Sequence, residues 1–155
     1  MSRSAIRRIE DPRPRFSGPG PNASCLSCQM DTKLIITEDG SHTLYVPGMD
    51  EHYHSRFGAI TESRHIFINA GLGSMDRSNI SILEVGLGTG LNALLTALYA
   101  GEKSLPVTYT ALEKYPLDPS LVSLLNYGTL IGGEAQEILT AIHDTPWNEP
   151  VALSD

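Results

Sequence analysis

The segment Ile82-Leu83-Glu84-Val85-Gly86-Leu87-Gly88-Thr89-Gly90-Leu91-Asn92 is the most informative part of this chain. A short apolar run rich in branched residues is typical of a buried strand, and this one carries Glu84 near its end. Three glycines at alternate positions follow, and then leucines spaced as on one face of a helix: Leu91, Leu94, Leu95 and Leu98. A strand, a glycine turn and a helix predict a nucleotide-type cofactor site, because glycines let a ligand approach the backbone and a helix start offers unpaired N–H groups.

The spacing of the glycines distinguishes between cofactors. A dinucleotide fingerprint needs a small third residue where this sequence has Leu91, and a P-loop needs a Gly-Lys-Ser/Thr that is absent here. The remaining pattern, E-x-G-x-G-x-G, is the one seen in methyltransferases that use S-adenosylmethionine. A second strand is expected at Val107–Glu113, where Glu113 is placed to accept the ribose hydroxyls. An ordinary glycine-rich turn is the alternative, and the paired acid favours S-adenosyl-L-methionine.

Length and composition set broad limits. A chain of 155 residues suits one domain, and it contains no apolar run of eighteen residues that would predict a membrane span. The basic N-terminus lacks the apolar centre of a secretory signal, so a cytoplasmic location is expected. Cys25 and Cys28 form a C-x-x-C pair without the second pair of ligands that a zinc site needs, so no metal is expected.

The first 29 residues differ from the remainder. They hold four of the ten prolines and a charge of +3, which leaves −10 for the remainder of a chain whose net charge is −7. Such an acidic body argues against extensive contact between this segment and nucleic acid. We expect residues 1–29 to be a disordered extension, with translation starting at Met30 as a hypothesis, and residues 30–155 to form the domain.

The remaining elements follow from local patterns. Two β-prone runs, Leu34–Thr37 and Thr43–Val46, surround Asp39-Gly40 and predict a hairpin. Helices are expected at Ala59–Ala70, Leu117–Tyr127 and Glu134–His143, and the start of a third strand is expected at Pro150. The predicted fold class is therefore α/β: a Rossmann-like domain, preceded by a small hairpin and helix. Because a doubly wound sheet needs more strands than these, the chain is expected to be the N-terminal portion of a larger domain.

A second cluster of functional side chains lies between the hairpin and the first helix. It contains Glu51-His52-Tyr53-His54-Ser55, with Glu62 and His65 further along. Nothing fixes these groups together as metal ligands, and H-E-x-x-H is absent. Tyr53, His54 and Glu62 are candidates for the wall of a substrate or cofactor cleft, and a purely structural role is the alternative.

Several motifs, taken in order, resemble one known family. They are Asp39-Gly40-Ser41-His42-Thr43-Leu44, Glu51-His52-Tyr53-His54-Ser55, Gly58-Ala59-Ile60-Thr61-Glu62-Ser63, Gly88-Thr89-Gly90-Leu91-Asn92 and Glu113-Lys114-Tyr115-Pro116-Leu117. In this order they are similar to the tRNA 5-methylaminomethyl-2-thiouridine methyltransferases, the methyltransferase part of MnmC and its stand-alone relatives. The resemblance covers the chain from about Leu34 to its end.

The resemblance implies methylation of an aminomethyl group on the wobble uridine of tRNA. S-adenosylmethionine would be the donor, and a separate or fused flavin-dependent oxidase would perform the preceding step. The cofactor would be bound by Glu84, Gly86, Gly88, Gly90, Asn92, Glu113 and Lys114. No catalytic residue is assigned, because the family's aspartate, followed by Gly/Ala-Phe-x-Pro, is expected beyond the last residue. A non-catalytic, vestigial or partner-binding fragment and a methyltransferase for a small molecule or a protein are the alternatives.

Overall fold

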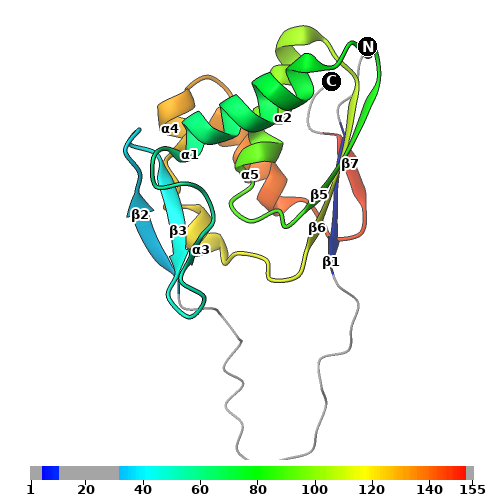
Figure 1. Ribbon diagram of the computed structural model, residues 1–155. Coiled ribbons are helices and arrows are strands. Elements are labelled where there is room, and N and C mark those ends of the chain that lie inside the picture. The colour runs from blue at the N-terminus through cyan, green and yellow to red at the C-terminus, as the bar shows by residue number, and fades with distance from the viewer. Residues whose placement is uncertain (1–4, 11–31, 153–155) are drawn as a thin grey trace, which may run out of the picture.

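Two sheets lie on either side of a layer of helices in the computed structural model, which describes residues 5–10 and 32–152 (Figure 1). The larger sheet has the strand order β5-β6-β1-β7, with bounds Ile80–Val85, Val107–Glu113, Ala5–Glu10 and Pro150–Ala152. The smaller sheet has the order β2-β3-β4, with bounds Lys33–Ile36, His42–Val46 and Glu51–His52. The protein is thus a mixed α/β protein, and β5, β6 and β1 are mutually parallel.

The small sheet begins with the hairpin that the sequence predicted. Strands β2 and β3 pair antiparallel from Lys33 opposite Tyr45 to Ile36 opposite His42. Gly40 has φ +82°, a backbone conformation that glycine adopts without strain. The prediction of a hairpin around Asp39-Gly40 is confirmed.

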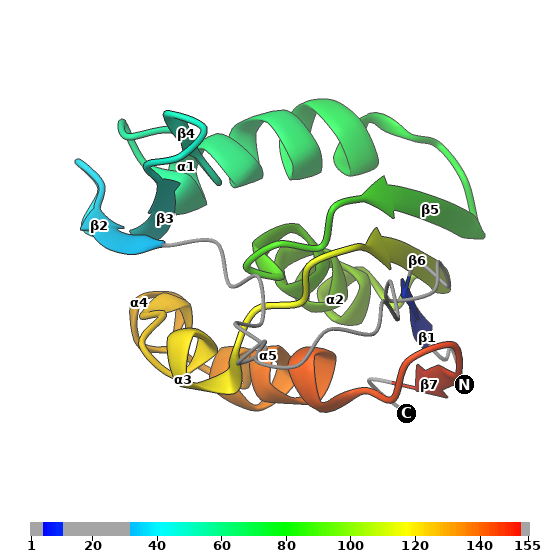
Figure 2. The ribbon, with the colours of Figure 1, turned by 90° about the horizontal axis from the view of Figure 1, so that it is seen from below.

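The first helical segment follows this sheet. Helix α1, Ala59–Glu62, continues directly into a π-helical segment, η1 (Ser63–Gly71), and a 3₁₀ turn, η2 (Leu72–Ser74). Ile60 and Ile68 are buried. The helical character of this region is confirmed, but most of it has the wider π spacing instead of a regular α-helix. Figure 2 shows this rod along one side of the molecule, beside β5.

The prediction of one continuous helix at Leu117–Tyr127 is wrong. The structure has two short helices, α3 (Pro119–Val122) and α4 (Tyr127–Ile131), with a break between them. At the break, the Asn126 side chain accepts a hydrogen bond from the His42 N–H and donates one to the Gly40 carbonyl, each at 2.9 Å. These bonds tie the chain to the hairpin, and this tertiary contact interrupts a locally favourable helix.

The other two helices form the centre of the core. Helices α2 (Leu91–Lys103) and α5 (Ala135–Asp144) pack against each other, and α2 also packs on η1 and β6. Leu91, Leu94 and Leu139 are fully buried between them. The predicted helix at Glu134–His143 is therefore confirmed within one residue at each end. None of the described helices is long and apolar enough to cross a membrane.

The prediction that residues 1–29 are disordered is wrong for Ala5–Glu10. Residues Ala5–Glu10 form strand β1, which pairs parallel with β6 and places Ile6 in the core. Arg8 is also buried; its guanidinium donates to the Thr145 carbonyl and lies 4.0 Å from the centre of the Trp147 ring. A chain starting at Met30 would lack this strand. Residues 11–29, with Cys25 and Cys28, lie outside the described part of the chain.

The strand predicted to start at Pro150 is present. Residues Pro150–Ala152 do form a strand, but β7 runs antiparallel to β1 and does not pair with β6. The place beside β6 is taken by β1. In the described residues, the helices cover one face of the large sheet, and on the other face Leu83 and Val85 are 65% and 82% exposed.

Candidate functional site

The glycine loop, Gly86–Gly90, connects β5 to the start of α2. Gly86, Gly88 and Gly90 all have positive φ, at +90°, +54° and +75°. A Cβ atom on Gly88 would lie 2.9 Å from the Tyr53 ring, and one on Gly90 would lie 2.9 Å from His143 Nε2. A Cβ on Gly86 would meet no atom within 4 Å. Glycine is therefore needed for packing at two of these positions, while Gly86 faces open space that a ligand could occupy.

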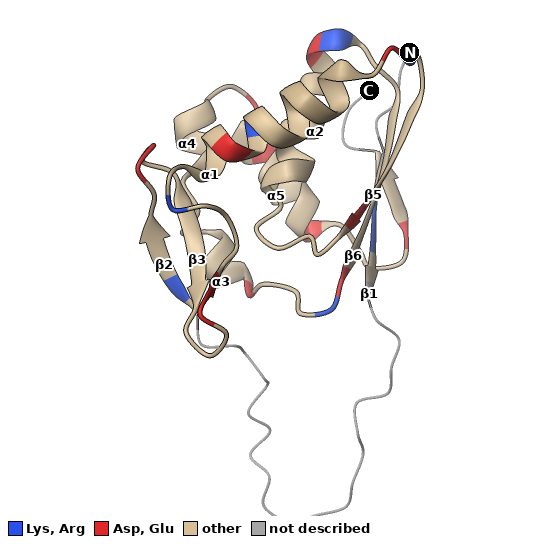
Figure 3. Ribbon diagram, in the orientation of Figure 1, with Lys and Arg blue, Asp and Glu red and all other residues tan. Residues whose placement is uncertain are grey.

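Glu113 holds this loop from the end of the neighbouring strand. Its Oε2 accepts a hydrogen bond from the Gly88 N–H at 3.0 Å, and its Oε1 accepts one from the Tyr115 N–H at 2.7 Å. A carboxylate has about four acceptor positions, so two stay available for hydroxyl groups of a ligand. Figure 3 shows acidic residues near the ends of both β5 and β6. Lys114 is exposed, and its ammonium lies 4.8 Å from the centre of the Tyr115 ring.

Glu84 lies behind the loop, against α2. Its Oε1 accepts a hydrogen bond from Asn92 Nδ2 at 3.0 Å, while its Oε2 is buried without a partner among the described residues. The buried hydroxyl of Tyr109 also makes no hydrogen bond of good geometry, but it lies beside Glu84, and a hydrogen bond between the two groups lowers the pKa of Glu84 and raises that of Tyr109. Burial raises the pKa of the Glu84 carboxyl, and burial and the charge of Glu84 raise the pKa of Tyr109. Tyr109 satisfies the carboxylate only in part, and incompletely paired buried polar atoms are costly, so this corner suits a ligand that supplies a further donor.

The three residues predicted to line a cleft come from the hairpin side. Tyr53 is half-buried with its ring against Gly88, and its pKa is raised by burial and by the charge of Glu113. His54 Nε2 lies 2.8 Å from the Thr89 hydroxyl. Glu62 Oε2 accepts a hydrogen bond from the Ser55 N–H at 2.8 Å, which holds the segment that carries Tyr53 and His54. The structure thus brings Tyr53 and His54 to the glycine loop, and Glu62 supports them.

Two residues at the loop were not singled out from the sequence. Thr89 is 1% exposed, and its carbonyl accepts a hydrogen bond from His143 Nε2 at 3.1 Å. Thr89 stood inside the glycine motif and could have been noted there. His143 lies 54 residues away on α5, and its local pattern predicts only a helix end.

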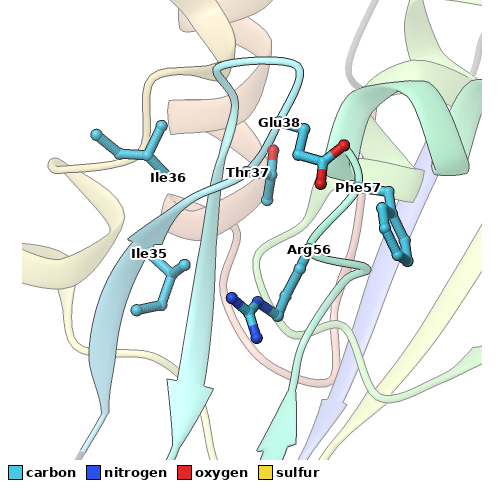
Figure 4. Close-up of a pocket in the computed structure, with 6 residues that line it drawn as sticks. All are labelled: Ile35, Ile36, Thr37, Glu38, Arg56 and Phe57. Atoms are coloured by element: carbon cyan, nitrogen blue, oxygen red, sulfur yellow. The ribbon is translucent and has the colours of Figure 1, made fainter.

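Other possible sites in the described residues are less well formed. No group of three His, Cys, Asp or Glu side chains there could hold a metal ion. A hollow of about 620 Å³ lies on the small sheet, lined by Ile35, Ile36, Thr37, Glu38, Arg56 and Phe57 (Figure 4). In this view, the Arg56 guanidinium and the Glu38 carboxylate point in different directions. The hollow includes no residue of the glycine loop.

These observations define a class before any comparison: a mixed α/β protein with a glycine turn and two acids at neighbouring ends of parallel strands. The arrangement is consistent with a Rossmann-like fold. No protein-family model matches the chain. Among solved structures, the crystal structure of MnmC2 from Aquifex aeolicus is similar, with a TM-score of 0.50 and 33% identity, over 59% of this chain and 32% of that chain.

Curated relatives carry one name, the tRNA 5-methylaminomethyl-2-thiouridine biosynthesis bifunctional protein MnmC. The protein from Magnetococcus marinus is 34% identical over 87 residues, which is 52% of this chain. Those from Burkholderia multivorans and Cupriavidus metallidurans are 35% and 34% identical over 92 and 90 residues. The resemblance to the MnmC-like family is confirmed. The chain spans only 13% of the length of each of these relatives.

Proposed function

We propose that this chain forms the S-adenosylmethionine-binding part of an MnmC-like methyltransferase that acts on the 5-aminomethyl group of the wobble uridine in tRNA. The observation that carries the proposal is the pair of acids around the glycine loop: Glu113 on the loop backbone, and Glu84 with a buried oxygen that makes no well-formed hydrogen bond. The names of the similar curated proteins, which describe biosynthesis of 5-methylaminomethyl-2-thiouridine in tRNA, support the choice of substrate.

The residues present fit this cofactor in charge and in shape. The open side of Gly86 admits a ligand against the backbone, and the remaining lone pairs of Glu113 suit the two ribose hydroxyls. The unpaired Oε2 of Glu84 suits a cationic group such as an ammonium. When bound, the cofactor would supply an activated methyl group on a sulfonium. Tyr53, whose ring lies against Gly88, would form part of the wall that excludes water from the reacting atoms.

Binding is the first test of this proposal. Isothermal titration of the purified chain with S-adenosylmethionine should give saturable binding. Gly88→Val should abolish it, because φ of +54° and the Tyr53 ring leave no room for a side chain. Circular dichroism would establish that both proteins are folded. A folded wild-type chain that does not bind the cofactor would overturn the proposal for this chain.

Glu113 offers a graded version of the same test. Glu113→Ala should weaken cofactor binding by about 1–3 kcal/mol, since hydroxyl groups of the ligand lose their acceptor. The matched control is Glu102→Ala, which removes an exposed carboxylate at the far end of α2 and should leave affinity unchanged. Equal affinities of the wild type and Glu113→Ala would exclude Glu113 from the site. Transfer of labelled methyl groups to tRNA with the 5-aminomethyl group then tests the substrate.

A further inference from the structure

Thr89 is the one polar side chain inside the glycine loop, and its hydroxyl and its carbonyl oxygen each meet a different histidine. His54, just after β4, places Nε2 2.8 Å from the hydroxyl. His143, in the last turn of α5, places Nε2 3.1 Å from the carbonyl oxygen. The two histidines are 89 residues apart in the sequence and belong to separate parts of the fold. The loop is therefore held from both sides by groups outside the strand–turn–helix unit.

The hydrogen bond from His143 has a defined direction. A carbonyl oxygen only accepts, so the Nε2 of His143 must carry the proton that it donates. The approach depends on Gly90, because a Cβ at that position would lie 2.9 Å from Nε2. Gly90 and His143 thus form a matched pair: the absence of a side chain on one permits the hydrogen bond of the other.

The helix end that carries His143 is itself fixed. Leu139 and Ile142 are fully buried beside it. Thr145, which ends the helix, donates its hydroxyl to the Ala141 carbonyl at 2.7 Å and accepts a hydrogen bond from Arg8. Because burial and these hydrogen bonds fix the end of α5, His143 can set the position of the Thr89 carbonyl and, with it, the direction of the neighbouring N–H groups.

We infer that His143 is a positioning residue of the glycine loop, holding through Thr89 the backbone conformation that binds the cofactor, with His54 holding the side chain of the same residue. This inference rests on the proposed function, because it concerns the affinity of the loop for S-adenosylmethionine. In this role, neither histidine contacts the reacting atoms.

The charge state of the two rings matters for this role. Burial lowers the pKa of both His54 and His143, so both are neutral at neutral pH. Glu62 faces His54 and opposes the shift; Arg8 on β1 adds to the shift of His143, while the Thr89 carbonyl and Asp144 oppose it. Protonation in acid would place two positive charges beside a loop that, as proposed, binds a cationic sulfonium compound. Affinity should therefore fall in acid, at pH values below the range in which an ordinary histidine is protonated.

The test compares two substitutions at His143 in the full chain. His143→Leu removes the donor and should weaken S-adenosylmethionine binding about fivefold, the loss expected for one neutral hydrogen bond. His143→Gln keeps an N–H at a similar distance from the backbone and should bind within about twofold of wild type. His65→Leu, an exposed histidine on η1, is the matched control and should leave affinity unchanged.

A merely structural role would give a different result. In that case His143→Leu would lower the melting temperature while the folded molecules kept wild-type affinity, and the inference would be overturned. If His143→Leu does not fold, His143→Gln provides the test. The affinity of His143→Gln for the cofactor should depend less on acid pH than the affinity of wild type. A pH profile identical to that of wild type would contradict the inference. If the wild-type chain binds no S-adenosylmethionine, the proposed function and this inference both fail. If the wild-type chain binds it and His143→Leu binds it with the same affinity, this inference alone fails.

Discussion

Two carboxylates, Asp39 in the hairpin turn and Glu84 near the end of β5, are held under opposite conditions. Asp39, in the hairpin turn, is exposed and yet accepts five hydrogen bonds, from Thr37, Ser41 and Thr61. Glu84, beside the glycine loop, is half-buried and accepts one well-formed hydrogen bond, and its buried second oxygen has only the Tyr109 hydroxyl nearby. Proteins normally satisfy buried polar atoms first. The reversal indicates that the hairpin turn is structurally complete, while the glycine turn lacks a partner that a ligand could supply.

The pKa values of the two acids shift in opposite directions. Burial alone would raise the pKa of Asp39, but the hydrogen bonds from Ser41, Thr61 and Thr37 outweigh it and hold it well below its usual range. Burial raises the pKa of Glu84, and the hydrogen bonds from Asn92 and Tyr109 only partly offset this. Asp39 should therefore stabilise the fold as an anion, and Glu84 should destabilise it as an anion.

The largest effect on stability is expected at Asp39. Asp39→Ala leaves the buried hydroxyls of Ser41 and Thr37 without this acceptor and should lower the free energy of unfolding by about 2 kcal/mol, a value reduced because solvent reaches the site. Urea denaturation measures the change. Asp76→Ala, another exposed aspartate, should change stability by less than about 0.5 kcal/mol. Equal effects of the two substitutions would show that the network around Asp39 does not stabilise the turn.

A smaller effect of opposite sign is expected at Glu84. Glu84→Gln removes a buried negative charge, so at pH 7 it should raise the free energy of unfolding by about 1 kcal/mol. It should also weaken S-adenosylmethionine binding, because the ligand loses its anionic partner. A Glu84→Gln protein with lower stability would mean that the carboxylate is satisfied in the free protein. Glu102→Gln, which alters an exposed ion pair, serves as the control for charge alone.

The smallest expected effects are the changes with pH in the free energy of unfolding of each variant relative to wild type. The pKa of Asp39 is lowered by folding, so its contribution is present above about pH 3.9 and is lost as the pH falls further. The pKa of Glu84 is raised by folding, so its cost is absent in acid and grows as the pH rises above about 4.3. The gap between wild type and Asp39→Ala should narrow in acid, and so should the gain from Glu84→Gln. Urea midpoints at pH 3.5 and pH 7 measure both changes, and a gain at Glu84 that does not depend on pH would contradict the assignment.

Local sequence patterns predicted much of the fold and only part of the site. The hairpin at Asp39-Gly40 and helix α5 follow from contacts within a few residues, so their patterns were sufficient. The helix predicted for Leu117–Tyr127 fails because Asn126 bonds to Gly40, 86 residues away. Strand β1 was missed because its six residues precede a proline-rich segment, while its pairing partner, β6, lies about a hundred residues further on.

The sequence by itself determined the strand, the glycine turn and the helix that follows it, because three glycines and a leucine period act over short distances. It also placed Glu84 and Glu113 at the ends of neighbouring strands. Only the tertiary structure decided what surrounds the turn: the Tyr53 ring on Gly88, and His54 and His143 on the two polar groups of Thr89. Those contacts join elements far apart in the chain, and their geometry depends on how the helices pack, which no local pattern encodes.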